Sequence, residues 1–144
     1  MVGHLNDAHD CVGTDLSTRQ IDYARATYGA PGARFYATTP AQLPSDEARF
    51  DAATLVELIE HLHPALVDET IGAALDRLRP GGRLVVNAIT LENAGETYQA
   101  LRARGLCPEV TLLQIARAEP LAHYLRYEAL NPIQIFAVTR PEAA

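Results

Sequence analysis

The chain is poor in several features, and each shortage excludes a class of protein. No apolar run approaches the roughly 20 residues of a membrane-spanning helix, and His4, Asp7 and Asp10 make the first residues too polar for a signal peptide. We therefore expect a cytoplasmic protein without a membrane partner. The two cysteines, Cys11 and Cys107, lie far apart in the sequence and match no metal spacing. They predict buried, reduced thiols and no structural zinc.

Basic residues are also scarce. The chain has 12 of them against 18 acidic residues, a net charge of −6, and all 12 are arginines scattered singly. Such a surface repels phosphate backbones on average, so we expect no nucleic-acid partner. A local basic pocket is compatible with this balance, and Arg117, Arg126 and Arg140 could meet a substrate rich in carboxylates.

The overall composition is typical of a soluble domain with one core. The 144 residues, 48% apolar and 21% charged, predict a single domain over residues 1–144. Strands and helices alternate, and two successive strands end the chain, which predicts an α/β sheet with an antiparallel edge. The predicted strands are Val12–Leu16, Ala33–Thr38, Phe50–Val56, Leu84–Ile89, Val110–Ala116 and Ile133–Thr139. Sixteen residues separate the last two.

Three helices are predicted between these strands. Ser17 followed by Gln20 is a capping-box pattern that begins the first, which Gly29 ends. The second covers Pro64–Leu78 and ends at Pro80, where Gly81-Gly82 turns the chain into a strand. The third covers Ala94–Arg104 and ends at Gly105. Helical spacing predicts inward side chains at Ile21, Ala24, Tyr28, Leu66, Ile71, Leu75, Leu78, Tyr98 and Leu101, and apolar content predicts a buried strand at Phe50–Val56.

A glycine-rich turn after the first strand is missing. Open α/β sheets bind nucleoside cofactors at the carboxyl ends of their strands, usually over such a turn. Residues 1–11 contain neither the strand nor the turn.

Several motifs resemble one family of enzymes. Leu78-Arg-Pro-Gly-Gly82 is similar to the segment before the fifth strand of class I S-adenosylmethionine-dependent methyltransferases. Three further stretches resemble the decarboxylating precorrin C15 methyltransferases of cobalamin biosynthesis: Asn87-Ala-Ile-Thr-Leu-Glu92, Leu113-Gln-Ile-Ala-Arg117 and Glu128-Ala-Leu-Asn-Pro-Ile133. The resemblance implies a doubly wound Rossmann-like sheet with an antiparallel terminal pair.

The same resemblance implies that the first strand is absent. The strand ending at Asp15 then corresponds to the family's second strand, and His4–His9 to the end of its first helix. Neighbouring strands lie about 4.8 Å apart, so the missing strand would leave two rows of backbone groups without partners. Either the two edges close up, or another chain fills the slot, or the sequence is a fragment or starts too far downstream. We expect either a fragment or a start placed too far downstream.

S-adenosylmethionine is the cofactor that the resemblance implies. Asp15, with Leu16 beside it, would bind the ribose hydroxyls, as a carboxylate does well; the alternative for Asp15 is an acid that stabilises a helix end. Thr38 and Thr39 stand where relatives place an Asp that contacts adenine. Val56 and Glu57 would form a wall of the cofactor site.

Val56-Glu-Leu-Ile-Glu-His-Leu62 resembles other branches of the class, which include the ubiquinone type and metal-dependent RNA ribose methyltransferases. Glu57, Glu60 and His61 could ligate a metal, but they are too few without a second His cluster, so we expect no metal. His61 and His63 are expected to cap and pack.

The resemblance implies a tetrapyrrole as the substrate. Asn87, Thr90 and Asn131 would line its pocket, and Arg117 would pair with its carboxylates, as would Arg126 unless it is a surface residue. Catalysis would come mostly from placing the two reactants, and no catalytic residue is assigned. Alternatives left open are another small molecule or an RNA end as acceptor, or a non-catalytic domain that binds a partner through its strand edges. A homo-oligomer is also open.

Overall fold

The computed structural model describes residues 10–45 and 49–142. They belong to two compact units, an N-terminal unit within residues 1–47 and a C-terminal unit within residues 48–144. The segment His4–His9 lies outside the described residues. No described helix is both long enough and apolar enough to cross a membrane.

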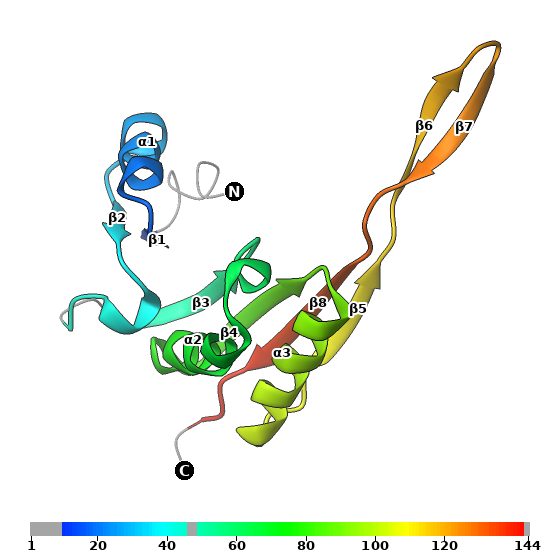
Figure 1. The fold of residues 1–144 in the computed structure, drawn as a ribbon. Coiled ribbons are helices and arrows are strands. Elements are labelled where there is room, and N and C mark those ends of the chain that lie inside the picture. The colour runs from blue at the N-terminus through cyan, green and yellow to red at the C-terminus, as the bar shows by residue number, and fades with distance from the viewer. Residues whose placement is uncertain (1–9, 46–48, 143–144) are drawn as a thin grey trace. The chain divides into compact units, whose positions relative to one another are not determined.

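The N-terminal unit is a strand, a helix and a second strand (Figure 1). Its elements are β1 (Cys11–Asp15), α1 (Thr18–Tyr28), β2 (Ala33–Ala37) and the short helix η2 (Pro40–Gln42). β1 and β2 pair in parallel, as the alternation of strand and helix predicts. The predicted cap is confirmed, because the Ser17 hydroxyl accepts a hydrogen bond from the Gln20 backbone N–H at 3.3 Å. Of the inward positions expected on this helix, Ile21 is buried, whereas Tyr28 is exposed.

The C-terminal unit is built on a four-stranded sheet in the order β3-β4-β8-β5 (Figure 1). β3 and β4 are parallel, and β8 runs antiparallel to both β4 and β5, which confirms the antiparallel terminal pair. The elements are β3 (Phe50–Leu55), η3 (Ile59–His61), α2 (Pro64–Asp76), β4 (Leu78–Ala88), α3 (Leu91–Ala103), β5 (Glu109–Leu113), β6 (Ala116–Leu121), β7 (Tyr124–Ala129) and β8 (Ile133–Thr139).

Helices α2 and α3 bury one face each in the core of this unit. Residues at helical spacing form that face, among them Val67 and Ile71 on α2 and Leu101 on α3. The prediction of inward side chains was wrong at Leu66 and Tyr98, since both are exposed. Each stands one position from the buried stripe, and one position rotates a side chain by about 100°.

The chain enters β4 earlier than predicted. The helix ends at Asp76, and residues from Leu78 onward already belong to the strand. Phe50 pairs with Leu78 while Ala52 pairs with Arg83, so β4 has three extra residues in a bulge. Gly81 lies in this bulge with φ +77°, a left-handed conformation that glycine adopts without strain. The Arg79-Pro-Gly-Gly segment therefore bends a strand, where we had expected it to end a helix.

Arg140 has a structural partner at the end of α2. Its guanidinium donates to the backbone carbonyls of Leu75 at 3.0 Å and Asp76 at 3.1 Å. The last carbonyls of a helix lack the usual donor four residues further on, and a cation there also matches the negative end of the helix dipole. The structure therefore gives Arg140 a capping role, and a contact between Arg140 and the substrate stays a prediction.

Two expectations of burial were also wrong. In β3 only Leu55 is buried, and Ala52 is exposed; among the described strands β3 lies at the edge of its sheet, next to β4. Both cysteines are free, but Cys11 is half-buried and Cys107 is exposed. Leu106 takes the buried position beside Cys107.

A hairpin that the sequence did not reveal separates β5 from β8. We expected one strand over Val110–Ala116 and then a connecting segment before the last strand. Instead β5 ends at Leu113, and the chain continues as the antiparallel pair β6 and β7, which extends beyond the sheet (Figure 1). Every residue of both arms is exposed, and without a buried face the segment looked like a loop.

Candidate functional site

Polar side chains of the N-terminal unit gather at the carboxyl ends of its two parallel strands. Asp15 ends β1 and is paired in register with Ala37, the last residue of β2. Thr38 and Thr39 follow directly, and both hydroxyls donate to Oε1 of Gln42, at 3.1 and 3.4 Å. These residues occupy the edge at which open α/β sheets bind ligands.

One of the two carboxylate oxygens of Asp15 is hydrogen-bonded within the chain. Its Oδ1 accepts from the Ser17 backbone N–H at 2.7 Å, beside the N-terminus of α1. The helix-end role is therefore present. The carboxylate is exposed, and among the described residues its Oδ2 has no hydrogen-bond partner, so a vicinal diol could still bind there. The assignment to ribose stays a prediction, as does that of the neighbouring, exposed Leu16.

In the C-terminal unit, Glu57 and Asn87 lie at the carboxyl ends of the parallel strands β3 and β4 and are joined by two hydrogen bonds. The Glu57 backbone N–H donates to Oδ1 of Asn87 at 2.9 Å, and Nδ2 of Asn87 donates to Oε1 of Glu57 at 3.0 Å. Asn87 is 8% exposed and lies near the end of β4, while Glu57 is the second residue after β3. The sequence singled out both residues but did not show that they bind each other.

Glu57 is also conformationally strained. Its φ of +52° is left-handed, which costs a residue with a side chain about 1–2 kcal/mol. The two bonds to Asn87 hold it there. Val56 beside it is exposed. Strained backbone of this kind concentrates at functional sites, so the observation supports a role for residues 56–57 without specifying it.

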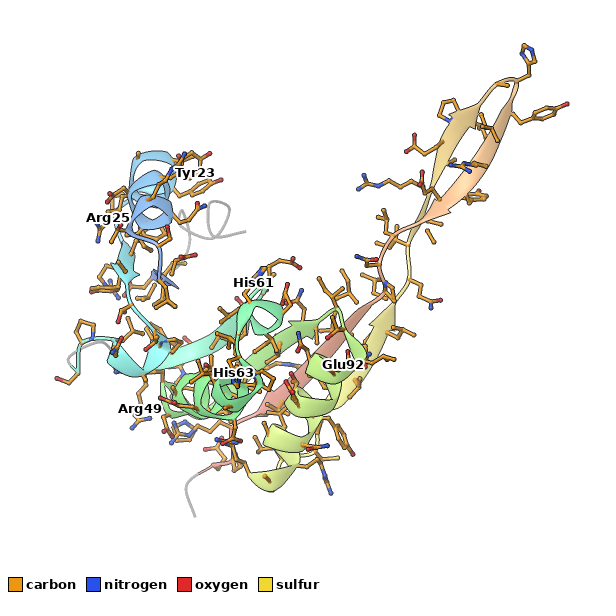
Figure 2. All side chains as sticks on the ribbon, viewed as in Figure 1. Tyr23, Arg25, Arg49, His61, His63 and Glu92 are labelled. Atoms are coloured by element: carbon orange, nitrogen blue, oxygen red, sulfur yellow. The ribbon has the colours of Figure 1, made fainter. Side chains whose placement is uncertain are left out.

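The remaining polar residues of this segment do not form a metal centre. His63 accepts from the Ala65 N–H at 3.3 Å as the N-cap of α2, which agrees with the expected capping role. His61, which ends η3, and His63 are both labelled in Figure 2. The Glu60 carboxylate oxygens are buried without a hydrogen-bond partner. In the described part of the chain, no three His, Cys, Asp or Glu side chains are grouped so as to hold an ion.

The predicted substrate residues fall into two groups. Asn87 and Thr90 lie at the end of β4, where Thr90 caps α3 by accepting from the Asn93 N–H at 3.2 Å. Asn131 precedes β8, whose Gln134 pairs with Ala88 at that same end. Arg117 and Arg126 lie instead on the hairpin, paired in register with Glu128 and Glu119.

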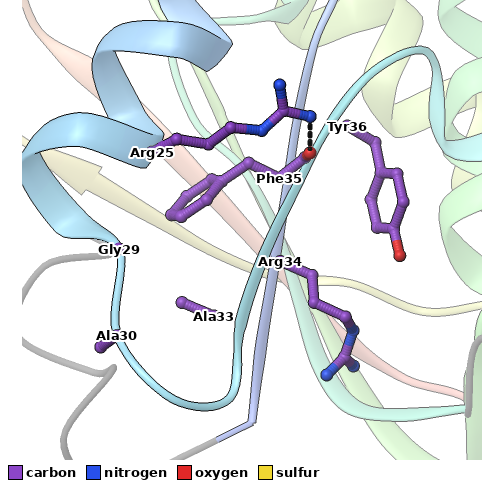
Figure 3. A pocket seen from close by; sticks show the side chains of 7 residues that line it. All are labelled: Arg25, Gly29, Ala30, Ala33, Arg34, Phe35 and Tyr36. Atoms are coloured by element: carbon purple, nitrogen blue, oxygen red, sulfur yellow. Dashed lines mark hydrogen bonds between the residues drawn. The ribbon is translucent and has the colours of Figure 1, made fainter.

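A separate hollow of about 390 Å³ lies in the N-terminal unit between α1 and β2 (Figure 3). Arg25 closes one side and donates to the Phe35 carbonyl at 2.7 Å. Gly29 and Ala33 also line it, which places it at the amino end of β2, opposite Asp15 and Thr38. It is therefore not the edge at which this class of sheet binds its cofactor.

Comparison with known proteins defines the class first. Residues 1–82 match the family model described as a methyltransferase domain, whose members use S-adenosylmethionine as methyl donor. Residues 64–140 match the model described as a precorrin methyltransferase domain, and the chain belongs to that family. This confirms the family that the motifs at Asn87–Glu92, Arg117 and Asn131 indicated.

Individual relatives agree with the family. A protein assigned as a cobalt-precorrin-6B C(15)-methyltransferase (decarboxylating) from Methanothermobacter thermautotrophicus is 35% identical over 69 residues, which are 48% of this chain and 36% of the relative. The chain thus spans about a third of the length of the curated relative that it matches.

Solved structures show the same fold. The precorrin-6y C5,15-methyltransferase of Geobacter metallireducens superposes with a TM-score of 0.71 at 20% identity, over 90% of this chain and 67% of the other. The C-terminal domain of the Rhodobacter capsulatus precorrin-6Y C5,15-methyltransferase gives 0.66 at 26% identity, over 90% and 67%. These likenesses confirm the α/β methyltransferase sheet.

Proposed function

We propose that this protein is an S-adenosylmethionine-dependent methyltransferase that methylates a precorrin at C15 and removes an acetate carboxyl group during cobalamin biosynthesis. The observation that carries the proposal is the match of residues 64–140 to the precorrin methyltransferase domain. The name of the curated relative supports the same reaction.

The donor set at the carboxyl ends of β1 and β2 fits the nucleoside part of the cofactor. Asp15 can accept from ribose hydroxyls with its remaining carboxylate oxygen, and the hydroxyls of Thr38 and Thr39 can bond to adenine. Val56 and Glu57 would contact the cofactor from the end of β3. When bound, S-adenosylmethionine supplies an electrophilic methyl group.

The chain's part in methyl transfer is to place the reactants. Thr90 and Asn131, at the end of the sheet where β4 meets β8, offer neutral hydrogen bonds to a tetrapyrrole. Asn87 already uses its amide oxygen and one amide hydrogen on Glu57, so its contribution is to position Glu57. Arg117 would hold a substrate carboxylate, and a cation there would stabilise charge that develops as carboxylate is lost.

A labelled-methyl assay tests this function. The protein is incubated with S-adenosylmethionine labelled in its methyl group and with a precorrin, and in parallel with a capped RNA, each with and without a metal chelator. We expect label in the tetrapyrrole that chelation does not reduce, because carbon methylation by proximity needs no cation.

The alternatives predict different results. Label in RNA that disappears with chelator and returns with a divalent ion would favour the RNA-end reaction, because a metal activates a poor hydroxyl nucleophile. The double variant Glu60→Gln/His61→Ala is the matched control, and it should change the rate only modestly. No binding of S-adenosylmethionine in any form of the protein would favour a non-catalytic domain.

A further inference from the structure

Two short segments connect the sheet to the hairpin of β6 and β7 (Figure 1). The last pair of β5 and β8 joins Leu113 to Ile133. Just beyond it, the Leu130 N–H donates to the Ile115 carbonyl at 2.9 Å, and the ladder of the hairpin follows in the same register. Between these two pairs, one residue of the first segment stands opposite the two residues Asn131-Pro132 of the second. Such two-against-one pairing is a β-bulge, and bulges are common beside active sites, where they redirect side chains.

Ile115 and Leu130 form an exposed apolar pair next to this bulge. Ile115 is 46% exposed and Leu130 is 41% exposed, and the hydrogen bond between their backbones holds them side by side. Residues paired across an antiparallel ladder lie on the same face. The pair therefore presents two branched aliphatic side chains together to solvent, and apolar groups that are exposed together beside polar residues are typical of binding sites.

A cation follows the aliphatic pair on the same face. Side chains alternate between the two faces of a strand at about 3.4 Å per residue, so Arg117 shares the face of Ile115 and lies about 7 Å further along. Glu128 is paired with Arg117 in register. Among the described residues Arg117 forms no ion pair. Its guanidinium therefore has donors to offer to a carboxylate of a ligand.

The residues already assigned to the substrate lie on the sheet side of the aliphatic pair. β4 and β8 pair as far as Ala88 and Gln134, and Thr90 and Asn131 lie just beyond that pair. All of these residues belong to the C-terminal unit. In order from the sheet outward, the surface thus offers neutral hydrogen-bonding groups, two aliphatic side chains and then a cation.

We propose that Ile115 and Leu130 are specificity-determining residues on which the macrocycle of the substrate lies, between Asn131 and Arg117. The inference rests on the proposed function, because it takes the substrate to be a tetrapyrrole.

The chemistry of the surface matches that class of substrate. A tetrapyrrole combines a largely apolar macrocycle with carboxylates at its periphery, so it needs an apolar contact with a cation beside it. An RNA end instead offers phosphates and bases, and proteins bind unpaired bases mainly by stacking them on aromatic side chains. Ile115 and Leu130 are aliphatic and cannot stack a base in that way, so the pair favours the macrocycle over an RNA end.

Serine substitutions test the aliphatic pair. Ile115→Ser and Leu130→Ser should each raise KM for the precorrin about tenfold, because burial of an aliphatic side chain against the macrocycle is lost. The value of kcat should change little, since such a contact is equally strong in the ground state and the transition state. Calorimetric titration with the precorrin alone should show the same loss without turnover.

Two control variants separate this role from a structural one. Leu112→Ser removes an exposed leucine from the opposite face of β5 and should leave KM unchanged. Leu130→Met keeps the size and apolar character of the side chain and should bind the precorrin nearly as wild type does. The melting temperature of each variant shows that it is folded.

A charge variant should act in the opposite direction. Glu128→Gln removes the acid beside Arg117 and should tighten binding of the precorrin about twofold to fivefold, the range for an exposed charge pair. Arg117→Gln should weaken binding by a similar factor. Weaker binding by Glu128→Gln would overturn the placement of a substrate carboxylate at Arg117.

Failure of this inference and failure of the proposed function give different results. If wild type methylates the precorrin but Leu130→Ser and Leu112→Ser bind it equally well, the aliphatic pair is not the substrate surface and the function stands. A wild type that neither binds nor methylates the precorrin would overturn both.

Discussion

Asn87 shows how one polar residue in an apolar strand can organise a site. Its carboxamide satisfies the backbone and the side chain of Glu57 together, and so fixes a residue with left-handed backbone at the end of β3. The signal was present in the sequence, since an Asn between Val86 and Ala88 has to find a partner when it is buried. Its partner lies 30 residues away, and periodicity cannot supply such a pairing.

Removal of the Asn87 amide should therefore loosen the end of β3. Asn87→Ala is expected to lower the free energy of unfolding by about 1–3 kcal/mol, the cost of leaving polar groups of Glu57 without partners. It should also weaken S-adenosylmethionine binding. Thr90→Ala, which removes a helix cap nearby, should cost about 1 kcal/mol and affect binding less. Urea unfolding measures the stability of each variant, and calorimetric titration measures its affinity for S-adenosylmethionine. Equal losses of affinity in Asn87→Ala and Thr90→Ala would argue against a positioning role for Asn87.

Asp15 can be tested in a form of the protein that binds S-adenosylmethionine measurably. Asp15→Ala should weaken binding by about 1.5–3 kcal/mol, the range for hydrogen bonds to a charged group. Part of any stability loss will come from the bond to Ser17 N–H. Asp15→Asn is the control, because its amide oxygen can keep that bond while the charge is lost. Unchanged affinity together with a lower melting temperature would leave Asp15 only its helix-end role.

At the scale of elements, the sequence predicted the order of strands and helices well and the residues at which they begin and end less well. Each predicted helix exists, because amphipathic spacing and caps such as Ser17 and Gly105 are local signals. The Arg79-Pro-Gly-Gly segment was misjudged, since Pro and Gly suit a helix end and a strand bulge equally. Which one forms depends on pairing with Phe50 and Arg140, two distant segments.

The bulge in β4 depends on a glycine with left-handed backbone. Gly81→Ala is expected to destabilise the chain by about 1–2 kcal/mol, because φ +77° is strained for any residue with a Cβ. Gly95→Ala is the matched control. Gly95 lies in α3 with nothing within 4 Å of an added Cβ, and there alanine should stabilise by about 0.5–1 kcal/mol. In urea unfolding we expect the two substitutions to change the free energy of unfolding in opposite directions. A Gly81→Ala variant more stable than wild type would contradict the left-handed backbone at the bulge.

A salt bridge links α2 to α3 and gives the unit a dependence on pH. Hydrogen bonding from Arg104 holds the pKa of the Asp68 carboxyl below its ordinary value, with a smaller contribution from the charge of Arg104. Because Asp68 is 63% exposed, solvent screening limits the contribution to about 0.5–1 kcal/mol. Because the pKa of Asp68 is lower in the folded state, the salt bridge contributes its full stabilisation at pH values above the unfolded-state pKa of about 3.9. It is lost as the pH falls through the lower folded value.

Comparison with Asp68→Asn tests the sign of that effect. Wild type should be more stable than the variant at neutral pH, and the difference in the free energy of unfolding should shrink below about pH 4. Urea unfolding across this range measures it. A difference that grows toward low pH would show that the carboxylate is not stabilised by Arg104.

At the scale of the whole molecule, the family could be predicted from short motifs, whereas the hairpin could not. Asn87–Glu92 and the residues around Arg117 and Asn131 lie within the stretch that matches the precorrin methyltransferase domain. The arms of β6 and β7 are exposed on both faces within one chain. A sequence pattern that expects each strand to bury a face against the core of its own chain therefore missed them.

The proposed reaction makes one quantitative demand, which is that methylation and decarboxylation occur on the same substrate. The most direct measurement supplies a precorrin whose acetate side chain carries labelled carboxyl carbon, together with S-adenosylmethionine labelled in its methyl group, and counts both labels. We predict one methyl group gained by the tetrapyrrole for each carbon dioxide released. Methyl transfer to a different small molecule or to RNA, with no carbon dioxide released from the precorrin, would contradict the assignment.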